Sequence, residues 1–202
     1  MKADSVVFTI AGMCFGIILG WVIGTQQAQR GPGAAVAPAA TAASGNTQPA
    51  AQLDEQRVKA LTEQVAKEPN NVEATVQLAN AYMDGERFPD AIKWYEQALK
   101  LDPKNVNVST DLGVSYYYSN QTDRALQQLD YSLKLDPTHT KTLLNQGIVL
   151  AFGKRDLDAA SAAWQKIVEI APDSPEGRAA KQALEGVAAA HQQQQGSTAP
   201  GS

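Results

Sequence analysis

The chain has 202 residues, of which 44% are hydrophobic and 19% charged, and its formal net charge is −4. A wholly disordered protein would be less apolar and more highly charged, so that class is excluded. Because 17 Lys and Arg face 21 Asp and Glu, there is no basic excess, and nucleic acid is not an expected partner. With one cysteine and two histidines, we expect neither an intramolecular disulfide nor a metal site.

An uncharged apolar stretch, residues 6–24, lies near the amino terminus. Since about 20 apolar residues cross a bilayer, we predict a transmembrane anchor at 1–25. Lys2 precedes the stretch and Arg30 is the next charge after it, which favours a cytoplasmic amino terminus and an exported domain. In a bacterium this places the protein in the inner membrane with its domain in the periplasm. A cleaved signal peptide is the alternative, although the nearest A-x-A site, at 35–37, lies well beyond the stretch.

Glycines recur every four residues within this stretch, at Gly12, Gly16, Gly20 and Gly24. On a helix they form one stripe without side chains, where a second helix can approach closely. The stripe therefore predicts helix packing in the membrane, including self-association of the chain. Glycine is also common in membrane helices for no specific reason, which is the alternative.

Composition sets the boundaries of the remaining chain. Residues 26–52 are rich in Ala, Pro, Gly and Gln and lack large apolar side chains, so we predict a disordered linker. The last residues, 191–202, have a similar composition and are expected to form a disordered tail. One domain is therefore predicted, at 53–190.

The domain repeats itself with a period of 34 residues. The segment 78–103 returns at 112–137 and, with one extra residue in its turn, at 146–172. Apolar spacing indicates two helices in each unit, separated by turn formers and ended by proline. Small residues at matching positions predict close contact between the two helices, and large aromatic residues predict the filling between units. The small residues are Ala79, Gly113, Gly147, Ala91, Ala125 and Ala160, and the large ones Tyr82, Tyr95, Tyr116 and Trp164.

This pattern resembles the tetratricopeptide repeat, in its period, its L-G/A-x-x-Y first helix and its terminal D-P. The resemblance implies an all-α solenoid of about three helical hairpins, at 72–105, 106–139 and 140–174. A leading helix from residue 53 and a capping helix at 174–189 are expected to flank them, with Ser174 as N-cap.

The resemblance also implies a concave groove, lined by the first helix of each repeat, that holds a partner's peptide or helix. The residues expected to line it are Val76, Asn80, Met83, Thr110, Val114, Tyr117, Tyr118, Lys141, Leu144, Ile148 and Phe152. Tyr116 is expected in the core, because the three consecutive tyrosines cannot share one face. His139 is expected on the solvated surface.

One subgroup of the family holds a partner's terminal carboxylate with Lys, Asn and Arg. Asn80 and Lys141 occupy two of those places here, but Val76, Asp111 and Asn145 stand at the others. An aspartate facing a carboxylate is repulsive, so an apolar, aromatic groove is the better expectation.

No pairing of nucleophile and base, or of two acids, suggests catalysis, so we expect no enzymatic activity and no cofactor. The sequence predicts a membrane-tethered adaptor that binds another protein during assembly of the cell envelope. The alternatives are presentation of apocytochromes during maturation of c-type cytochromes, and assembly of a pilus or secretion machine.

Overall fold

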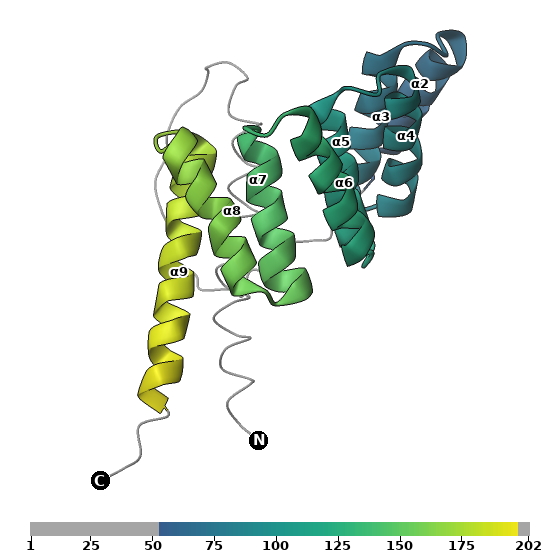
Figure 1. The fold of residues 1–202 in the computed structure, drawn as a ribbon. Coiled ribbons are helices and arrows are strands. Elements are labelled where there is room, and N and C mark those ends of the chain that lie inside the picture. Colours follow the sequence, from purple (N-terminus) through teal and green to yellow (C-terminus); the bar gives the residue numbers. More distant parts are fainter. Residues whose placement is uncertain (1–52, 198–202) are drawn as a thin grey trace, which may run out of the picture. The chain divides into compact units, whose positions relative to one another are not determined.

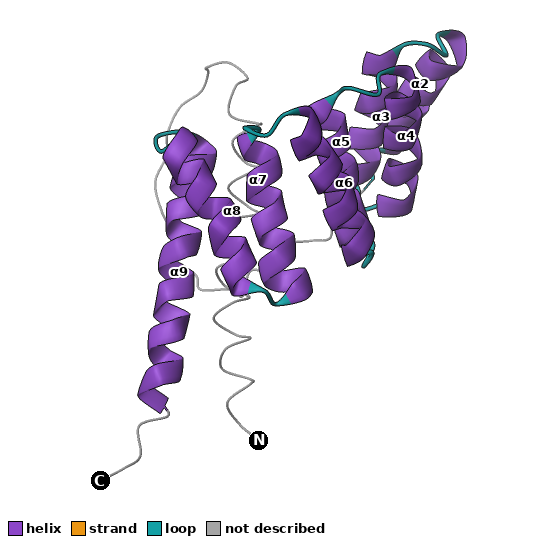
Figure 2. Cartoon of the chain, viewed as in Figure 1, coloured by secondary structure: helices purple, strands orange, loops and turns teal. Residues whose placement is uncertain are grey.

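The computed structural model describes residues 53–197, and side chains within 53–192. In that range every regular element is a helix (Figure 1, Figure 2). The predicted anchor, its glycine stripe and the linker lie outside the described residues. No helix of the described range is both long and apolar enough to cross a membrane. The helices are α2 (Glu55–Lys67), α3 (Val72–Asp84), α4 (Phe88–Leu101), α5 (Val106–Tyr118), α6 (Thr122–Leu135), α7 (Thr140–Ile148), the π-helix η1 (Val149–Lys154), α8 (Leu157–Ile170) and α9 (Pro175–Ser197).

The helices pair as hairpins, as the repeat pattern predicts. Helices α3 and α4, α5 and α6, and α7 and α8 pack against each other, and contacts of α4 with α5 and of α6 with α7 join successive hairpins. Helix α2 packs on α3 at the start of the stack. The all-α solenoid of three helical hairpins is therefore confirmed, with a leading helix before it (Figure 1).

Side-chain caps explain where the first helices of the first two hairpins begin. The side-chain oxygen of Asn71 accepts a hydrogen bond from the Ala74 amide at 2.9 Å, and Asn105 accepts one from Val108 at 3.1 Å. Each cap satisfies an amide that has no partner within the helix. The prolines predicted to end the second helices follow α4, α6 and α8 by two residues, at Pro103, Pro137 and Pro172.

The turns of the three hairpins share one left-handed residue, but the third turn is shifted. Glu86 and Asn120 have φ of 56° and 59° and are one 34-residue period apart, whereas Arg155, at 59°, falls one residue later. The extra residue lies within the π-helix that ends the first helix of this hairpin, whereas the sequence pattern places it in the turn. A π-helical turn holds one more residue than an α-helical turn, so α8 keeps its packing register.

Small residues bring the helices of each hairpin into contact. Ala79, Ala91, Ala125 and Ala160 are fully buried, as predicted. A methyl group added at Gly147 would lie 2.2 Å from Nε1 of Trp164, so no larger residue fits there without movement. Large aromatic residues were predicted to fill the space between the units. Tyr95, Tyr116 and Trp164 are buried, while Tyr82 is half-buried and packs against the core cluster that contains Tyr95 and Tyr116.

The last helix, α9, starts as predicted and ends later. Ser174 caps it, because its Oγ accepts a hydrogen bond from the Gly177 amide at 2.9 Å, and Pro175 is its first residue. Ala179, Ala180 and Ala183 are buried along one face. The helix continues past residue 189 to Ser197, into the predicted tail. Its sequence there is rich in Gln, which tolerates a helix well, and composition alone did not reveal this.

Candidate protein-binding face

The first helices of the three hairpins carry most of the residues expected to line the groove. We call this surface the α3–α5–α7 face. Eight of the eleven expected residues are half-buried, so they pack against the domain and still reach solvent. They are Val76, Asn80, Met83, Val114, Tyr117, Tyr118, Lys141 and Phe152. All of them except Asn80 and Lys141 are apolar or aromatic, and partly exposed side chains of that kind can be covered by a partner.

The other three expected residues are buried. Thr110 is fully buried, because its hydroxyl bonds the backbone oxygen of Val106 at 2.8 Å and the hydroxyl of Thr142 on the next hairpin at 2.6 Å. Leu144 and Ile148 are 2% and 5% exposed. These three residues were expected to line the groove, but the structure buries them. Helical spacing places residues on one face, but it does not say how much of that face the rest of the chain covers.

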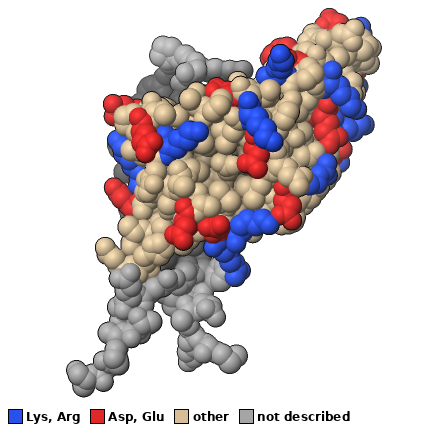
Figure 3. Space-filling model, in the orientation of Figure 1, with Lys and Arg blue, Asp and Glu red and all other residues tan. Residues whose placement is uncertain are grey.

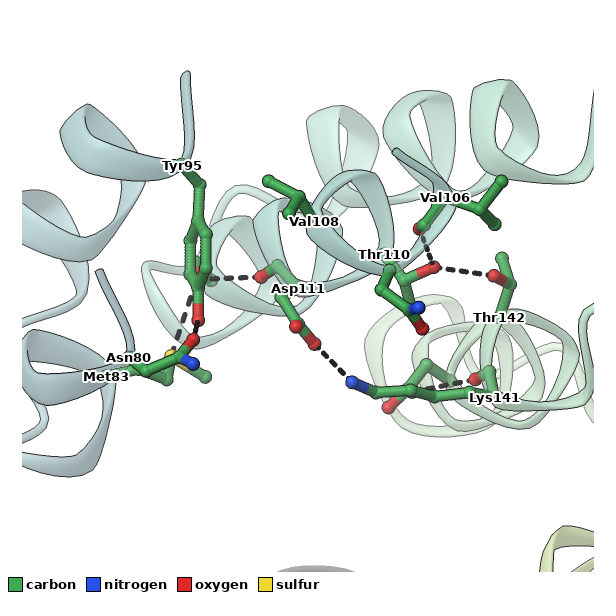
Figure 4. Close-up of polar contacts among 12 residues, drawn as sticks. Asn80, Met83, Tyr95, Val106, Val108, Thr110, Asp111, Lys141 and Thr142 are labelled. Carbon is green, nitrogen blue, oxygen red and sulfur yellow. Dashed lines mark hydrogen bonds and ion pairs between the residues drawn. The ribbon is translucent and has the colours of Figure 1, made fainter. Parts of the chain in front are cut away.

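A row of polar groups crosses the α3–α5–α7 face (Figure 4). The hydroxyl of Tyr95 donates a hydrogen bond to Oδ1 of Asn80 at 2.6 Å. Further along, Nζ of Lys141 donates to Oδ1 of Asp111 at 2.7 Å, and the two side chains are 27% and 26% exposed. Burial, reinforced by the charges of Asp111 and Asp84, raises the pKa of Tyr95 well above its ordinary value, so its hydroxyl stays a neutral donor.

An aromatic group lies where α5 ends. The rings of Phe88 and Tyr118 stack with centroids 5.0 Å apart, and those of Tyr117 and Tyr118 are tilted at 5.8 Å. Burial is the main cause that raises the pKa of Tyr118 to about 12. Both tyrosines therefore present a flat apolar ring and a neutral hydroxyl, a combination that is frequent in protein interfaces.

The π-helix approaches this aromatic group from the third hairpin. A methyl group added at Gly153 would lie 3.1 Å from Cε2 of Tyr117 and 2.8 Å from Cγ2 of Thr122. Glycine therefore permits the close contact between η1 and the end of α5. On the other side, Oγ of Ser115 donates to Sδ of Met83 at 3.4 Å, which joins α5 to α3.

His139 differs from its expected solvated position. It precedes α7 and is half-buried, with Nδ1 2.6 Å from the hydroxyl of Thr142 and Nε2 3.1 Å from Oδ1 of Asn107. Burial lowers its pKa, and the nearby charges of Asp136 and Lys141 act in opposite directions. Within residues 53–197, no group of three or more His, Cys, Asp or Glu side chains is arranged to hold a metal ion.

Two contacts at the α3–α5–α7 face were not predicted from the sequence. Phe88, the first residue of α4, stacks on Tyr118 at the edge of this face, and no sequence pattern indicated this contact. Asp111 was noticed as a carboxylate in the wrong place for binding an acidic partner, but not as the partner of Lys141. The two residues lie on α5 and α7, the first helices of neighbouring hairpins.

Two family models match most of the repeat region. One, described as TPR repeat, matches residues 79–118, and the other, described as tetratricopeptide repeat, matches 110–175. Residues 79–175 therefore match tetratricopeptide repeats. No curated protein matches the sequence.

Solved structures with a similar fold are repeat proteins of low sequence identity. A crystal structure of MamA is 19% identical with a TM-score of 0.54, over 68% of this chain and 88% of MamA. A tetratricopeptide repeat protein from Parabacteroides merdae is 22% identical with a TM-score of 0.55, over 63% and 51% of the two chains. The first TPR of Spaghetti, bound to the HSP90 peptide SRMEEVD, is 20% identical with a TM-score of 0.50, over 69% and 96%. These similarities show the fold.

Proposed function

We propose that the protein is an adaptor that binds a segment of another protein on its α3–α5–α7 face. The observation that carries this proposal is the row of half-buried apolar and aromatic side chains on the first helices of the repeats. Tyr117, Tyr118 and Met83 offer apolar contact area, and their packing within the domain has already reduced their conformational freedom. A rigid aromatic surface of this kind is a good anchor for a partner.

The charges on the visible surface do not suggest another class of partner. Lys and Arg side chains lie among Asp and Glu side chains on the face seen in Figure 3, without a continuous basic area. Nucleic-acid binding depends on such an area, because several phosphates must be neutralised together.

The adaptor is proposed to act while tethered to a membrane, with its domain on the outer side of a bacterial inner membrane. This part rests on the uncharged stretch 6–24, the charges on either side of it and the linker 26–52. Assembly of the cell envelope is the process that best suits a tethered adaptor in that compartment.

Site-directed photocrosslinking of the full chain in its native cells tests the proposal. A photoreactive amino acid at Tyr118 is expected to capture a partner, because that ring is half-buried on the α3–α5–α7 face. The same amino acid at Tyr131 is the matched control, since Tyr131 is a 41% exposed tyrosine on the second helix of its hairpin. Equal capture at both positions, or capture at Tyr131 alone, would place the partner elsewhere. Membrane fractionation and protease access in the same cells test the tether.

A further inference from the structure

A chain of polar contacts joins the first helices of the second and third hairpins. Nε2 of His139 lies 3.1 Å from Oδ1 of Asn107, and Nδ1 lies 2.6 Å from the hydroxyl of Thr142. That hydroxyl lies 2.6 Å from the hydroxyl of Thr110 (Figure 4), and both threonines are fully buried. We call these four residues the α5–α7 joint.

The residues at the same places between the first two hairpins are different. One period before the two threonines of the joint lie Val76 and Val108, and Val108 is buried in the apolar core cluster against which Val76 packs. One period before His139 lies Asn105, whose side chain caps α5, whereas the described structure has no side-chain cap at the start of α7. The joint therefore has buried hydroxyls and a titratable ring where the preceding hairpins have apolar packing and a helix cap.

The contacts of the joint suit a neutral imidazole. Nε2–H then donates to Asn107, the Thr142 hydroxyl donates to Nδ1, and the Thr110 hydroxyl donates to Thr142. When Nδ1 takes up a proton it becomes a donor, so Thr142 must donate to Thr110, and Thr110 to the backbone oxygen of Val106, 2.8 Å away. Each contact survives this reversal. The cost of protonation is therefore that of placing a charge in the joint, and not the loss of a hydrogen bond.

The surroundings of the ring disfavour that charge. His139 is half-buried, and it precedes α7, whose first turn carries the positive end of the helix dipole. The charged groups that face it come from the preceding turn, α7, α5 and α9, and they are Asp136, Lys141, Asp111 and Glu176. Asp111 is already paired with Lys141 at 2.7 Å. Burial has the largest influence and lowers the pKa of His139, because the three carboxylates do not outweigh burial and the ammonium group together.

We propose that the α5–α7 joint is pH-sensitive, and that protonation of His139 favours separation of the third hairpin from the second. The imidazolium is better hydrated in the open joint than in the closed one, so protonation and opening favour each other. Since α7 and η1 carry Lys141 and Phe152 to the α3–α5–α7 face, opening changes the shape of that face. The inference concerns the domain itself and goes beyond the adaptor function.

The test measures how often the joint opens, by the reactivity of a buried thiol. The full chain in detergent micelles carries Cys14→Ala, so that an introduced cysteine is its one thiol. Thr110→Cys places this thiol in the joint, where the side chain is fully buried and sulfur remains a weak donor and acceptor. The rate of labelling by a dipyridyl disulfide is divided by that of a cysteine peptide at the same pH, which removes the titration of the thiol itself. We expect this relative rate to be severalfold higher at pH 5.5 than at pH 7.5.

The matched control is Val108→Cys, because Val108 occupies the corresponding place between the first two hairpins and is 3% exposed. Its relative rate should be the same at both pH values. In the Thr110→Cys chain, His139→Asn should abolish the increase, since asparagine does not titrate and is the residue of the first two hairpins at this place. His139→Gln should do the same. Thr142→Cys, on the other side of the joint, is a second reporter if Thr110→Cys does not fold, as judged by circular dichroism.

Three results would overturn the proposal: equal relative rates for Thr110→Cys at both pH values, an increase that persists with His139→Asn, or an equal increase with Val108→Cys. The last result would indicate opening of the whole domain instead of the joint. Neither partner capture nor the membrane tether enters this measurement, so its outcome is independent of the adaptor proposal.

Discussion

Helix α5 places its three consecutive tyrosines on two different faces, one in the core and one on the α3–α5–α7 face. Tyr116 is 5% exposed, its hydroxyl donates to Oε1 of Glu96 at 2.6 Å, and the guanidinium of Arg124 lies 4.0 Å from the centre of its ring. Tyr117 and Tyr118 are half-buried and contact each other. The same residue type thus joins hairpins on one face and remains available on the other. We infer that changes on the core face reduce stability, whereas changes on the α3–α5–α7 face reduce binding.

The largest effect on stability is expected from Trp164→Ala. Trp164 is 2% exposed and its Nε1 donates to the backbone oxygen of Leu144 at 3.3 Å, so its loss leaves a cavity and removes this hydrogen bond. We expect the free energy of unfolding to fall by about 3–5 kcal/mol, measured by urea denaturation. The control Tyr131→Ala removes an exposed ring and should cost about 1 kcal/mol or less. A loss below 1 kcal/mol for Trp164→Ala would show that this face is not the core.

A smaller loss is expected from Gly147→Ala, because the added methyl group meets the buried ring of Trp164. Overpacking of this kind costs about 1–3 kcal/mol. Gly186→Ala is the matched control, since nothing lies within 4 Å of the methyl group it would add in α9. Alanine favours a helix, so the control should leave stability unchanged or raise it by up to about 1 kcal/mol. Comparison of the two variants separates the steric cost of the methyl group from helix propensity. A Gly147→Ala protein more stable than the wild type would contradict the close contact between Gly147 and Trp164.

These core positions are also the part of the fold that sequence reasoning predicted well. Gly147 and Trp164 stand at fixed places in a 34-residue period, and each hairpin can bury its apolar face only against its neighbours. The sequence shows that the third repeat has one extra residue, but a longer turn and a π-helix accommodate it equally well. Its place became clear only from the left-handed Arg155 and the register of α8.

The binding face was less predictable, because exposure depends on contacts between helices distant in sequence. The resemblance implied that Val114, Tyr118 and Leu144 line one groove, but in the structure Val114 and Tyr118 are half-buried and Leu144 is buried. Polar pairs across the repeats, such as Asp111 with Lys141, depend on rotamers that a single sequence does not specify.

The smallest expected effect is on the pH dependence of stability, and it comes from His139, which precedes α7. Burial lowers the pKa of His139 in the folded state, while Asp136, Asp111 and Glu176 raise it and Lys141 lowers it further. The unfolded chain therefore binds this proton more tightly, so stability is full at pH 7.5 and falls as the pH drops through the ordinary histidine value of about 6.5.

We expect His139→Gln to show a smaller drop in melting temperature between pH 7.5 and pH 5.5 than the wild type, because glutamine does not titrate. The exposed histidine of α9 provides the control, and His191→Gln should keep the wild-type drop. A drop that His139→Gln leaves unchanged would assign the pH dependence to other groups.

The separation of the two faces is tested most directly by measuring partner affinity and unfolding free energy on one double variant, Tyr117→Ala with Tyr118→Ala. The partner is the protein crosslinked at Tyr118, and the full chain is used throughout. Central aromatic residues of an interface contribute about 2 kcal/mol or more each, so affinity is expected to fall at least about 100-fold. Because both rings are only half-buried, the unfolding free energy should fall by no more than about 2 kcal/mol. Unchanged affinity in a folded double variant would contradict the account.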